Sequence, residues 1–217
     1  MANSTMSMNK VIHCAVRRDL RRFDAALAAF PDGDKDRAAA LHRAWENFDA
    51  QLTEHHEGEH EVAWPALLAV GVPQAQITRF DEEHEAMATA LRDAGTAMAA
   101  LASSGSRADA EAAAAAVTHL ERVTVTHLDH EEEMSEPLFA EKHDDPAIKE
   151  MGKKFSKRGG ITVAGTFFAW VQDGASPEEM AALKGSVPAP VLAIIGGLFG
   201  RRYRKEVQPV WAASRPH

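Results

Sequence analysis

Residues 55–65 read His-His-Glu-Gly-Glu-His-Glu-Val-Ala-Trp-Pro, and residues 127–137 read His-Leu-Asp-His-Glu-Glu-Glu-Met-Ser-Glu-Pro. The two stretches share one pattern: a histidine, a glutamate four residues later, and a proline six residues after the glutamate. In an α-helix, residues four apart lie one above the other, so each copy directs a neutral nitrogen and an anionic oxygen at one point. The repeat therefore predicts helices that present metal ligands.

A lone histidine precedes each copy at nearly the same distance. His13 lies 42 residues before His55, and His84 lies 43 residues before His127. Each pair therefore predicts one helical hairpin, and the two hairpins are expected to be related by a pseudo-two-fold axis. The sequence predicts that they converge on a dinuclear metal site with six ligands: His13, His55, Glu59, His84, His127 and Glu131.

Residues seven positions from the four histidines should lie two turns above and below them on the same inward face. All eight are apolar: Met6, Leu20, Phe48, Val62, Ile77, Leu91, Leu120 and Met134. The ligand layer is therefore expected between two dry layers, where metal satisfies the buried polar groups. A single His-x-x-x-Glu pair would more often be a solvated ion pair, but the doubled and phased set predicts a metal site.

The composition indicates an all-α chain, since alanine is abundant and the 14 glycines and 10 prolines gather in a few places. Helical spacing and turn residues predict four long helices over 8–30, 35–69, 74–102 and 108–142, typical of an up-down-up-down bundle. We expect residues 1–143 to form this bundle. Residues 144–217 are predicted to form a helical extension packed on it, with a basic, flexible segment at 153–160 and short helices at 161–172, 177–184 and 188–211.

Charge and cysteine content narrow the function classes. The formal net charge is −8 with a pI near 5.8, and no basic helix face is evident before residue 153, so we expect no nucleic-acid partner. Cys14 is the only cysteine, which excludes an intrachain disulfide and a cysteinyl iron–sulfur cluster. The first ten residues lack the apolar core of a signal peptide, and the longest apolar run is broken by prolines and glycines. We expect a cytoplasmic protein with no membrane partner.

The ligand set limits the metal chemistry. Four imidazoles and two carboxylates, without a thiolate, suit iron, zinc, manganese or copper. If Glu59 and Glu131 each bridge both ions, every ion obtains two nitrogens and two oxygens and keeps room for a solvent bridge and a labile ligand, as reactive sites do. Two carboxylates neutralise less charge than the four of ferritin-like bundles, which disfavours highly oxidised iron. Reversible binding or mild reduction of a small diatomic molecule is therefore favoured.

These motifs resemble the hemerythrin-like (HHE cation-binding) family over about residues 8–142. The resemblance rests on the two His-x-x-x-Glu segments with their downstream prolines, on His13 followed by Arg17-Arg18-Asp19-Leu20, and on His84 within Glu82-Glu83-His84-Glu85. It implies a four-helix bundle that holds a non-haem di-iron centre, two iron ions (Fe²⁺/Fe³⁺) with a bridging oxo or hydroxo ligand. The segments Pro188-Ala189-Pro190 and Phe199-Gly200-Arg201-Arg202-Tyr203 resemble extensions of actinobacterial members.

The family resemblance leaves two functions open. Its members include oxygen carriers, oxygen or iron sensors, and bacterial proteins linked to nitric oxide and iron–sulfur repair. The marine oxygen carriers use five histidines, one aspartate and one glutamate, so this chain's set of four histidines and two glutamates does not imply simple oxygen transport.

The leading hypothesis is a di-iron protein that binds and turns over NO, O₂ or H₂O₂ in nitric oxide or oxidative stress handling, as a nitric oxide reductase or a peroxidase/catalase-like oxidoreductase. The alternative is a non-enzymatic oxygen, iron or redox sensor, or an oxygen-binding protein; ferroxidase and zinc hydrolase activities rank lower. The electron donor stays open.

Further residues near the repeat were assigned by their helical position. His130 lies at the edge of the inward face, where it could ligate one iron or hydrogen-bond to a bound ligand; the alternative is a histidine that faces solvent. Val62 and Met134 are expected to line an apolar ligand pocket. His56 and His60 lie about a third of a turn off the ligand stripe and are expected at the surface. Cys14 is expected to be a small buried hydrophobe.

Overall fold

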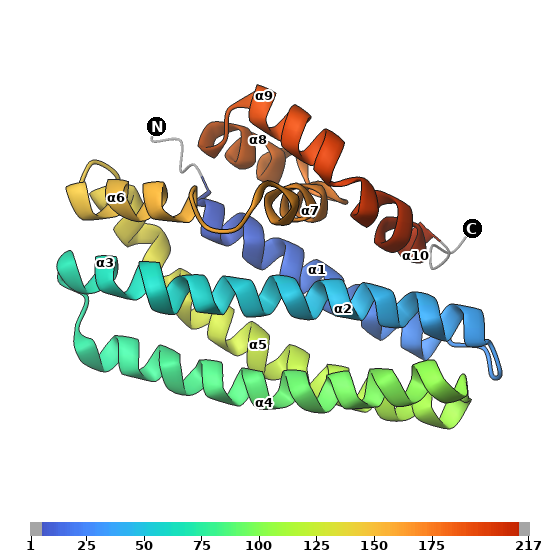
Figure 1. Ribbon diagram of the computed structural model, residues 1–217. Helices are drawn as coiled ribbons and strands as arrows, with labels where there is room; N and C mark the ends of the chain where they lie inside the picture. The colour runs from blue at the N-terminus through green and yellow to red at the C-terminus, as the bar shows by residue number, and fades with distance from the viewer. Residues whose placement is uncertain (1–5, 213–217) are drawn as a thin grey trace.

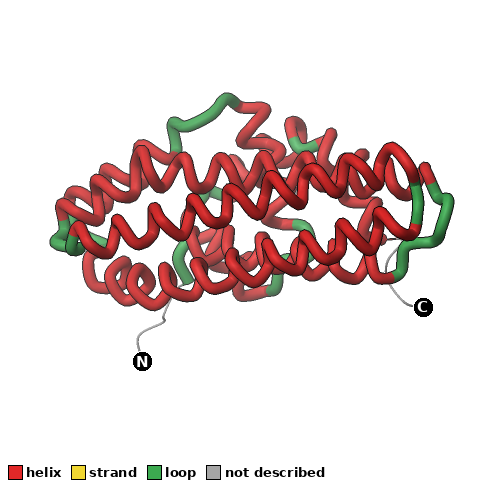
Figure 2. Tube along the Cα trace, turned by 90° about the horizontal axis from the view of Figure 1, so that it is seen from below, coloured by secondary structure: helices red, strands yellow, loops and turns green. Residues whose placement is uncertain are grey.

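The computed structural model describes residues 6–212, and within this range it contains helices and loops but no strand (Figures 1 and 2). This confirms the predicted all-α fold. Four long helices run back and forth along the molecule and account for most of its length: α1 (Met8–Ala28), α2 (Lys35–Gly58), α4 (Gln74–Ser104) and α5 (Arg107–Lys142). In the bundle α5 lies against both α1 and α4, and α4 also lies against α2.

Short polar caps begin three of the long helices. Ser7, Asp34 and Ser106 each accept a hydrogen bond from a backbone N–H three residues ahead, which satisfies a donor that the helix itself leaves free. Gly105 closes α4 with φ of 65°, a conformation that glycine adopts without strain. The Gly33 N–H donates to Gly105 O at 2.8 Å, so the α1–α2 turn and the α4–α5 turn are joined at one end of the bundle.

The second long helix contains a break that the helical spacing does not predict. The expected helix over 35–69 consists of α2, a π-helical turn η1 (Glu59–Ala63) and α3 (Trp64–Ala69). The Trp64 N–H bonds to Glu59 O, five residues back, and Pro65 follows with no N–H of its own. A π-turn adds a residue to the helix and re-aims the side chains that follow it. Pro137, at the same place in the second copy, lies inside the uninterrupted α5.

Because successive helices run in opposite directions, the bundle sorts the eight apolar residues into two layers. Leu20, Phe48, Leu91 and Leu120 belong to one large buried cluster on one side of the histidines. On the other side Ile77 and Met134 belong to a smaller cluster and Val62 is 8% exposed, whereas the half-buried Met6 packs against the large cluster. The ligand layer therefore lies between the two apolar regions, as the seven-residue spacing predicted for these residues other than Met6.

The C-terminal residues form short helices that lie along one side of the bundle (Figure 1). These are α6 (Pro146–Phe155), α7 (Ile161–Gln172), α8 (Pro177–Ser186), α9 (Ala189–Val191), the π-helical η2 (Leu192–Phe199) and η3 (Tyr203–Val207), and α10 (Gln208–Ala212). Helix α6 was not predicted, and its last turn contains Lys153 and Lys154, which had been assigned to a flexible segment. That expectation was wrong because residues 146–155 begin with an Asp145 cap and a proline, the usual start of a helix.

A buried hydrogen-bond network attaches this extension to α1. Trp170 Nε1 donates to Asp19 Oδ2 at 2.7 Å, and Asp19 also accepts from Arg18 and Arg22. Arg22 extends the network to Asp173, which lies 2.9 Å away. Buried residues of α7, η3 and α10 belong to the same apolar cluster as the bundle helices. The two parts thus share one core, and the division at residue 143 stays a prediction.

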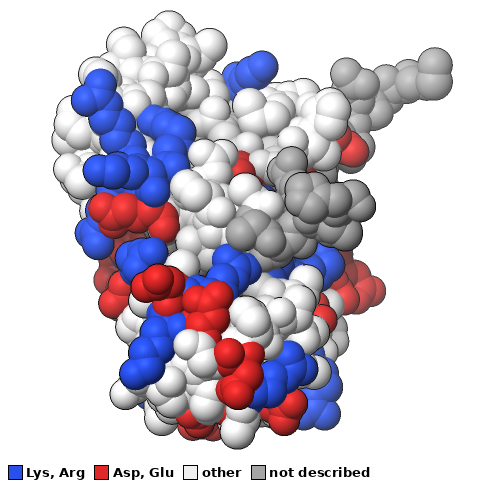
Figure 3. Space-filling model, turned by 90° about the vertical axis from the view of Figure 1, so that its right-hand side faces the viewer, with Lys and Arg blue, Asp and Glu red and all other residues white. Residues whose placement is uncertain are grey.

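The outer surface carries charges of both signs. Figure 3 shows acidic and basic side chains next to one another over the lower part of one face. Within residues 6–212, no single helix has both the length and the apolar composition to cross a membrane. The pair Pro177–Ser186 and Ala189–Phe199 reaches that length and composition only when the two are taken together, and it is bent by 107°.

Candidate metal centre

The six residues predicted as ligands meet in the middle of the bundle. His13 comes from α1, His55 from α2, His84 from α4 and His127 from α5, while the two glutamates follow one turn after His55 and His127. His13, Glu59, His127 and Glu131 are at most 2% exposed, and the side chains of His55 and His84 are 6% and 12% exposed. Their donor atoms form two groups that share Glu59.

The first group contains His13, His55, Glu59 and Glu131. Nε2 of His13 lies 3.2 Å from Nε2 of His55 and 3.2 Å from Oε2 of Glu131. Nε2 of His55 lies 3.1 Å from Oε1 of Glu59. Two imidazole nitrogens and two carboxylate oxygens thus converge on one point.

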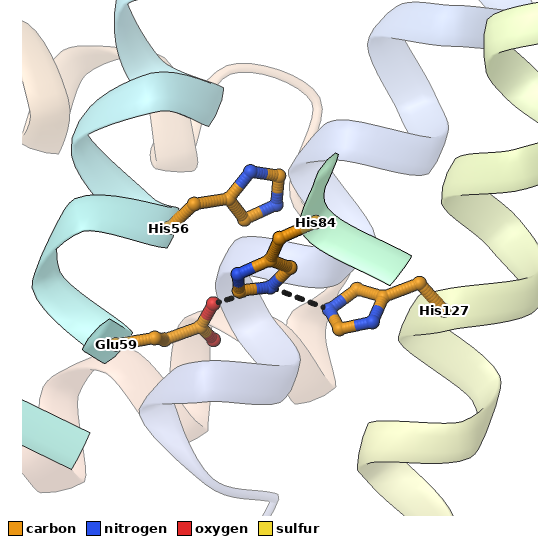
Figure 4. A group of neighbouring side chains, drawn as sticks. All are labelled: His56, Glu59, His84 and His127. Atoms are coloured by element: carbon orange, nitrogen blue, oxygen red, sulfur yellow. Dashed lines mark hydrogen bonds and ion pairs between the residues drawn. The ribbon is translucent and has the colours of Figure 1, made fainter. Parts of the chain in front are cut away.

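The second group contains His84, His127 and the other oxygen of Glu59 (Figure 4). Nε2 of His84 lies 3.0 Å from Nε2 of His127 and 3.4 Å from Oε2 of Glu59. Glu59 therefore presents one oxygen to each group, which is the geometry of a carboxylate that bridges two ions.

His56 also belongs to the second group, contrary to the expectation that it lies at the surface. Its ring stacks on His84, with 4.1 Å between the ring centres and 25° between the planes, and its Nε2 is buried without a hydrogen-bond partner. The surface assignment was wrong because α2 contacts α4 across this face, so a side chain beside the ligand stripe is enclosed by the neighbouring helix. His60 is 70% exposed, as expected.

The two glutamates are not arranged equivalently. Both oxygens of Glu59 are buried and accept no hydrogen bond, whereas Oε1 of Glu131 accepts one from the Asn9 amide at 3.0 Å. Oε2 of Glu131 lies 3.2 Å from Nε2 of His13 but 3.9 Å from Nε2 of His127. Glu131 therefore lies closer to the first group than to the second.

Two further carboxylates orient the histidines from behind. The Nδ1 atoms of His13 and His127 each lie 2.9 Å from a carboxylate oxygen, of Glu132 and Glu83 respectively. Such contacts fix the tautomer that directs Nε2 toward a metal. The doubled motif does not single out Glu132 or Glu83, although each is adjacent in sequence to a predicted ligand and carries a carboxylate.

His130 lies outside both ligand groups. Its Nδ1 is 2.8 Å from Oε1 of Glu83, whose other oxygen contacts His127, and Arg79 Nη2 lies 2.8 Å from the same nitrogen. The role of His130 toward iron or a bound ligand stays a prediction. His130 contacts the carboxylate that holds a ligand histidine.

Burial keeps most of the histidines ready to bind metal. Burial lowers the pKa of His84 to about 4, with a further contribution from His127. Burial and the neighbouring His13 hold the pKa of His55 well below its ordinary value, and the pKa of His127 is also lowered by burial. These imidazoles are therefore neutral at physiological pH, the form that ligates a metal. Burial opposes protonation of His13 too, but Glu131 and Glu132 outweigh it and raise its pKa.

The carboxylates show that the site suits a cation. Burial and the nearby Glu131 raise the pKa of Glu59 well above its ordinary value, because two buried carboxylates cannot both ionise cheaply without a positive charge. Both oxygens of Glu59 and Oε2 of Glu131 are buried without hydrogen-bond partners. Buried polar atoms normally have hydrogen-bond partners. These three oxygens have none, which is expected of atoms that coordinate metal ions.

The apolar residues expected to line a ligand pocket occupy different surroundings. Met134 lines a surface hollow at the α3–α4 turn, together with residues of 70–76 and Leu138. Val62 is buried in η1 and does not line this hollow. Between Met134 and the histidines lie Trp64, stacked on His84 with 5.6 Å between ring centres, and Phe80, whose ring meets His127 edge-on at 5.8 Å.

Comparison with known proteins agrees with this geometry. The sequence model described as the hemerythrin HHE cation-binding domain matches residues 9–139. No curated protein and no solved structure matches the chain. Because the match spans more than half of the chain, the chain belongs to the hemerythrin HHE family, whose members bind metal ions, typically iron.

Proposed function

We propose that this hemerythrin-family protein holds two iron ions, one in each ligand group, and binds and turns over a small ligand of the type NO, O₂ or H₂O₂. The single observation that carries the proposal is the Glu59 carboxylate, which is buried, unpaired and directed at both histidine groups. A single zinc ion or a surface cation would not require a carboxylate with one oxygen directed at each of two histidine groups. Iron, when bound, supplies redox chemistry and open coordination positions.

The residues of the chain supply position and a dry environment. Glu132 and Glu83 hold His13 and His127 so that both Nε2 atoms point inward. The apolar layers above and below exclude bulk water, and Trp64 and Phe80 cover the His84 and His127 rings. Small uncharged molecules partition into such surroundings more readily than ions do. These features favour NO, O₂ or peroxide over a large or charged substrate.

One observation favours a sensor as the second candidate. Arg158, which follows α6, contacts Glu54 at 3.0 Å and also contacts Glu61, so it spans the segment that carries His55 and Glu59. Phe155 of α6 packs against Gly58 in the same segment. A change in metal loading that shifts His55 or Glu59 would therefore act directly on the C-terminal extension.

The two candidates separate in one experiment. Protein reduced without oxygen is titrated with NO, O₂ and H₂O₂ in separate samples while the optical spectrum and the products are followed. Many turnovers to N₂O or water support an enzyme, whereas stable, reversible adducts support a sensor or carrier. Protein that binds fewer than two irons per chain after anaerobic loading would contradict the two-iron proposal itself.

A further inference from the structure

We infer that His56 is a seventh metal ligand: its Nε2 completes the second ion's site with His84, His127 and Glu59, so that the two ions have different ligands. The inference rests on the two-iron centre proposed above. It adds a residue that lies outside the doubled His-x-x-x-Glu motif and that the sequence pattern places off the ligand stripe.

The second site lacks a donor without His56. The first site has four donors, because Glu131 turns Oε2 toward His13. The same carboxylate cannot serve the second site equally, since Oε2 lies 3.9 Å from His127 and Oε1 accepts the Asn9 amide hydrogen. His84, His127 and Glu59 would then supply three donors, and His56 brings the second site to four.

Packing alone does not explain a histidine at this position. Stacking on His84 needs only an aromatic ring, yet the buried Nε2 of His56 has no hydrogen-bond partner. An unpaired buried polar atom destabilises the fold unless something satisfies it. At the equivalent place in the second copy, the residue after His127, the chain has the fully buried Leu128. An apolar residue therefore suits this helical position when packing is the only requirement.

The four atoms that would surround the second ion are drawn in Figure 4. His56 and Glu59 reach the site from the same helical stretch, and His84 and His127 reach it from α4 and α5. All of their donor atoms lie within 4.8 Å of one another. The separations of 3.0 Å between His84 and His127 and of 3.4 Å between His84 and Glu59 fit one ion at the ordinary metal–nitrogen and metal–oxygen distances of about 2.0–2.2 Å.

The added imidazole makes the two ions unequal in charge. The first ion faces two carboxylates and two neutral nitrogens, whereas the second faces one carboxylate and three neutral nitrogens. Anionic ligands stabilise the higher oxidation state, so the second ion is expected to stay ferrous when the first is oxidised. A partly oxidised sample should therefore contain a valence-trapped pair rather than two equivalent irons.

The test uses two matched phenylalanine variants of the full chain. His56→Phe keeps a ring to stack on His84 and removes the nitrogen, and His60→Phe makes the same change at a position that is 70% exposed. Both are loaded anaerobically with ⁵⁷Fe(II), desalted and analysed for iron per chain and by Mössbauer spectroscopy. A third variant, His56→Ala, is loaded with and without added imidazole.

Wild type and His60→Phe should bind two irons and show two distinct ferrous doublets. His56→Phe should bind the second iron at least about 10–100-fold more weakly, the loss typical of removing even an outer partner of a metal ligand. Imidazole should restore the second iron in His56→Ala. Two irons with unchanged doublets in His56→Phe would overturn the inference, as would an iron loss that imidazole does not repair. Wild type without iron would instead refute the two-iron centre.

Discussion

The Nδ1–H of His13 donates to Oε1 of Glu132, 2.9 Å away, so the imidazole directs its Nε2 to the centre of the bundle. Glu132 is itself held by Arg17, whose Nη1 lies 2.5 Å from the same oxygen. Burial alone would raise the pKa of Glu132, but His13 and Arg17 lower it to about 2, so the carboxylate is charged at every physiological pH. The orientation of one ligand is thus fixed by a chain of charges that reaches the surface.

Removing this support should weaken metal binding without removing a ligand. We expect Glu132→Gln to lower the affinity for the ion at His13 by about 10–100-fold, because the amide does not fix the required tautomer as strongly. The affinity is measured by competition with a coloured chelator. Glu133→Gln, at the exposed neighbouring position, is the control and should bind as wild type. Equal affinities in all three proteins would contradict the role of Glu132.

The two central glutamates should have unequal effects. Glu59 faces both histidine groups, so Glu59→Ala is expected to lose both irons. Glu131 faces only the first group, so Glu131→Ala should keep about one iron per chain at His56, His84 and His127. Elemental analysis after desalting measures this difference. Identical iron contents in the two variants would show that both carboxylates bridge equally.

The metal-free protein should lose stability as the pH falls. The pKa of His84 is lowered from 6.5 to about 4, so the unfolded chain binds this proton more readily than the native chain between those values. The contribution of His84 to the free energy of unfolding is fully present above pH 6.5. It is lost as the pH falls toward 4, by about 3 kcal/mol in total. His55, His56 and His127 shift in the same direction.

Urea denaturation of chelator-stripped protein across this pH range measures how steeply the free energy of unfolding changes with pH. His84→Phe, which keeps a ring for stacking on Trp64 and His56, should make this dependence on pH less steep. Iron-loaded protein should resist acid further, because bound metal competes with protons for the same nitrogens. A slope that is the same in wild type and His84→Phe would contradict the assignment of the proton to this residue.

The contact between Gly58 and Phe155 is expected to be sensitive to a single methyl group. A Cβ at position 58 would lie 2.9 Å from Phe155 Cε1, so Gly58→Ala should displace the end of α6. Hydrogen exchange over residues 146–158 is expected to increase. Gly152→Ala, where a Cβ meets nothing within 4 Å, is the control, and as a glycine-to-alanine change inside a helix it should stabilise by about 0.5–1 kcal/mol. Unchanged exchange in Gly58→Ala would show that α6 tolerates the displacement.

The buried Asp19–Trp170 hydrogen bond should stabilise the docked extension. Trp170→Phe removes the donor and leaves a buried carboxylate oxygen short of a partner, at a cost of about 1–3 kcal/mol in the free energy of unfolding. Urea denaturation gives the value. The iron content should stay at the wild-type level, because this contact is not part of either ligand group. Loss of iron would show that the extension supports the metal centre directly.

The helical bundle could be predicted from the sequence because helical periodicity and the doubled motif independently indicate the same four helices. Each of the four ligand histidines is bracketed by apolar residues seven positions away, so a shift of register would bury charge and expose the core. The phase of each helix, and with it the convergence of His13, His55, His84 and His127, could therefore be predicted. The capping residues and turns added the direction of each helix.

The chain alone determined which residues lie on the inward stripe, since that depends on local helical geometry. The tertiary structure decided what surrounds them: it enclosed His56 against α4, placed Glu132 and Glu83 behind two histidines, and turned one oxygen of Glu131 to Asn9. These features depend on contacts between segments as far apart as 122 residues. The spacing of residues within one helix does not predict these contacts, because they form only when the four helices pack together.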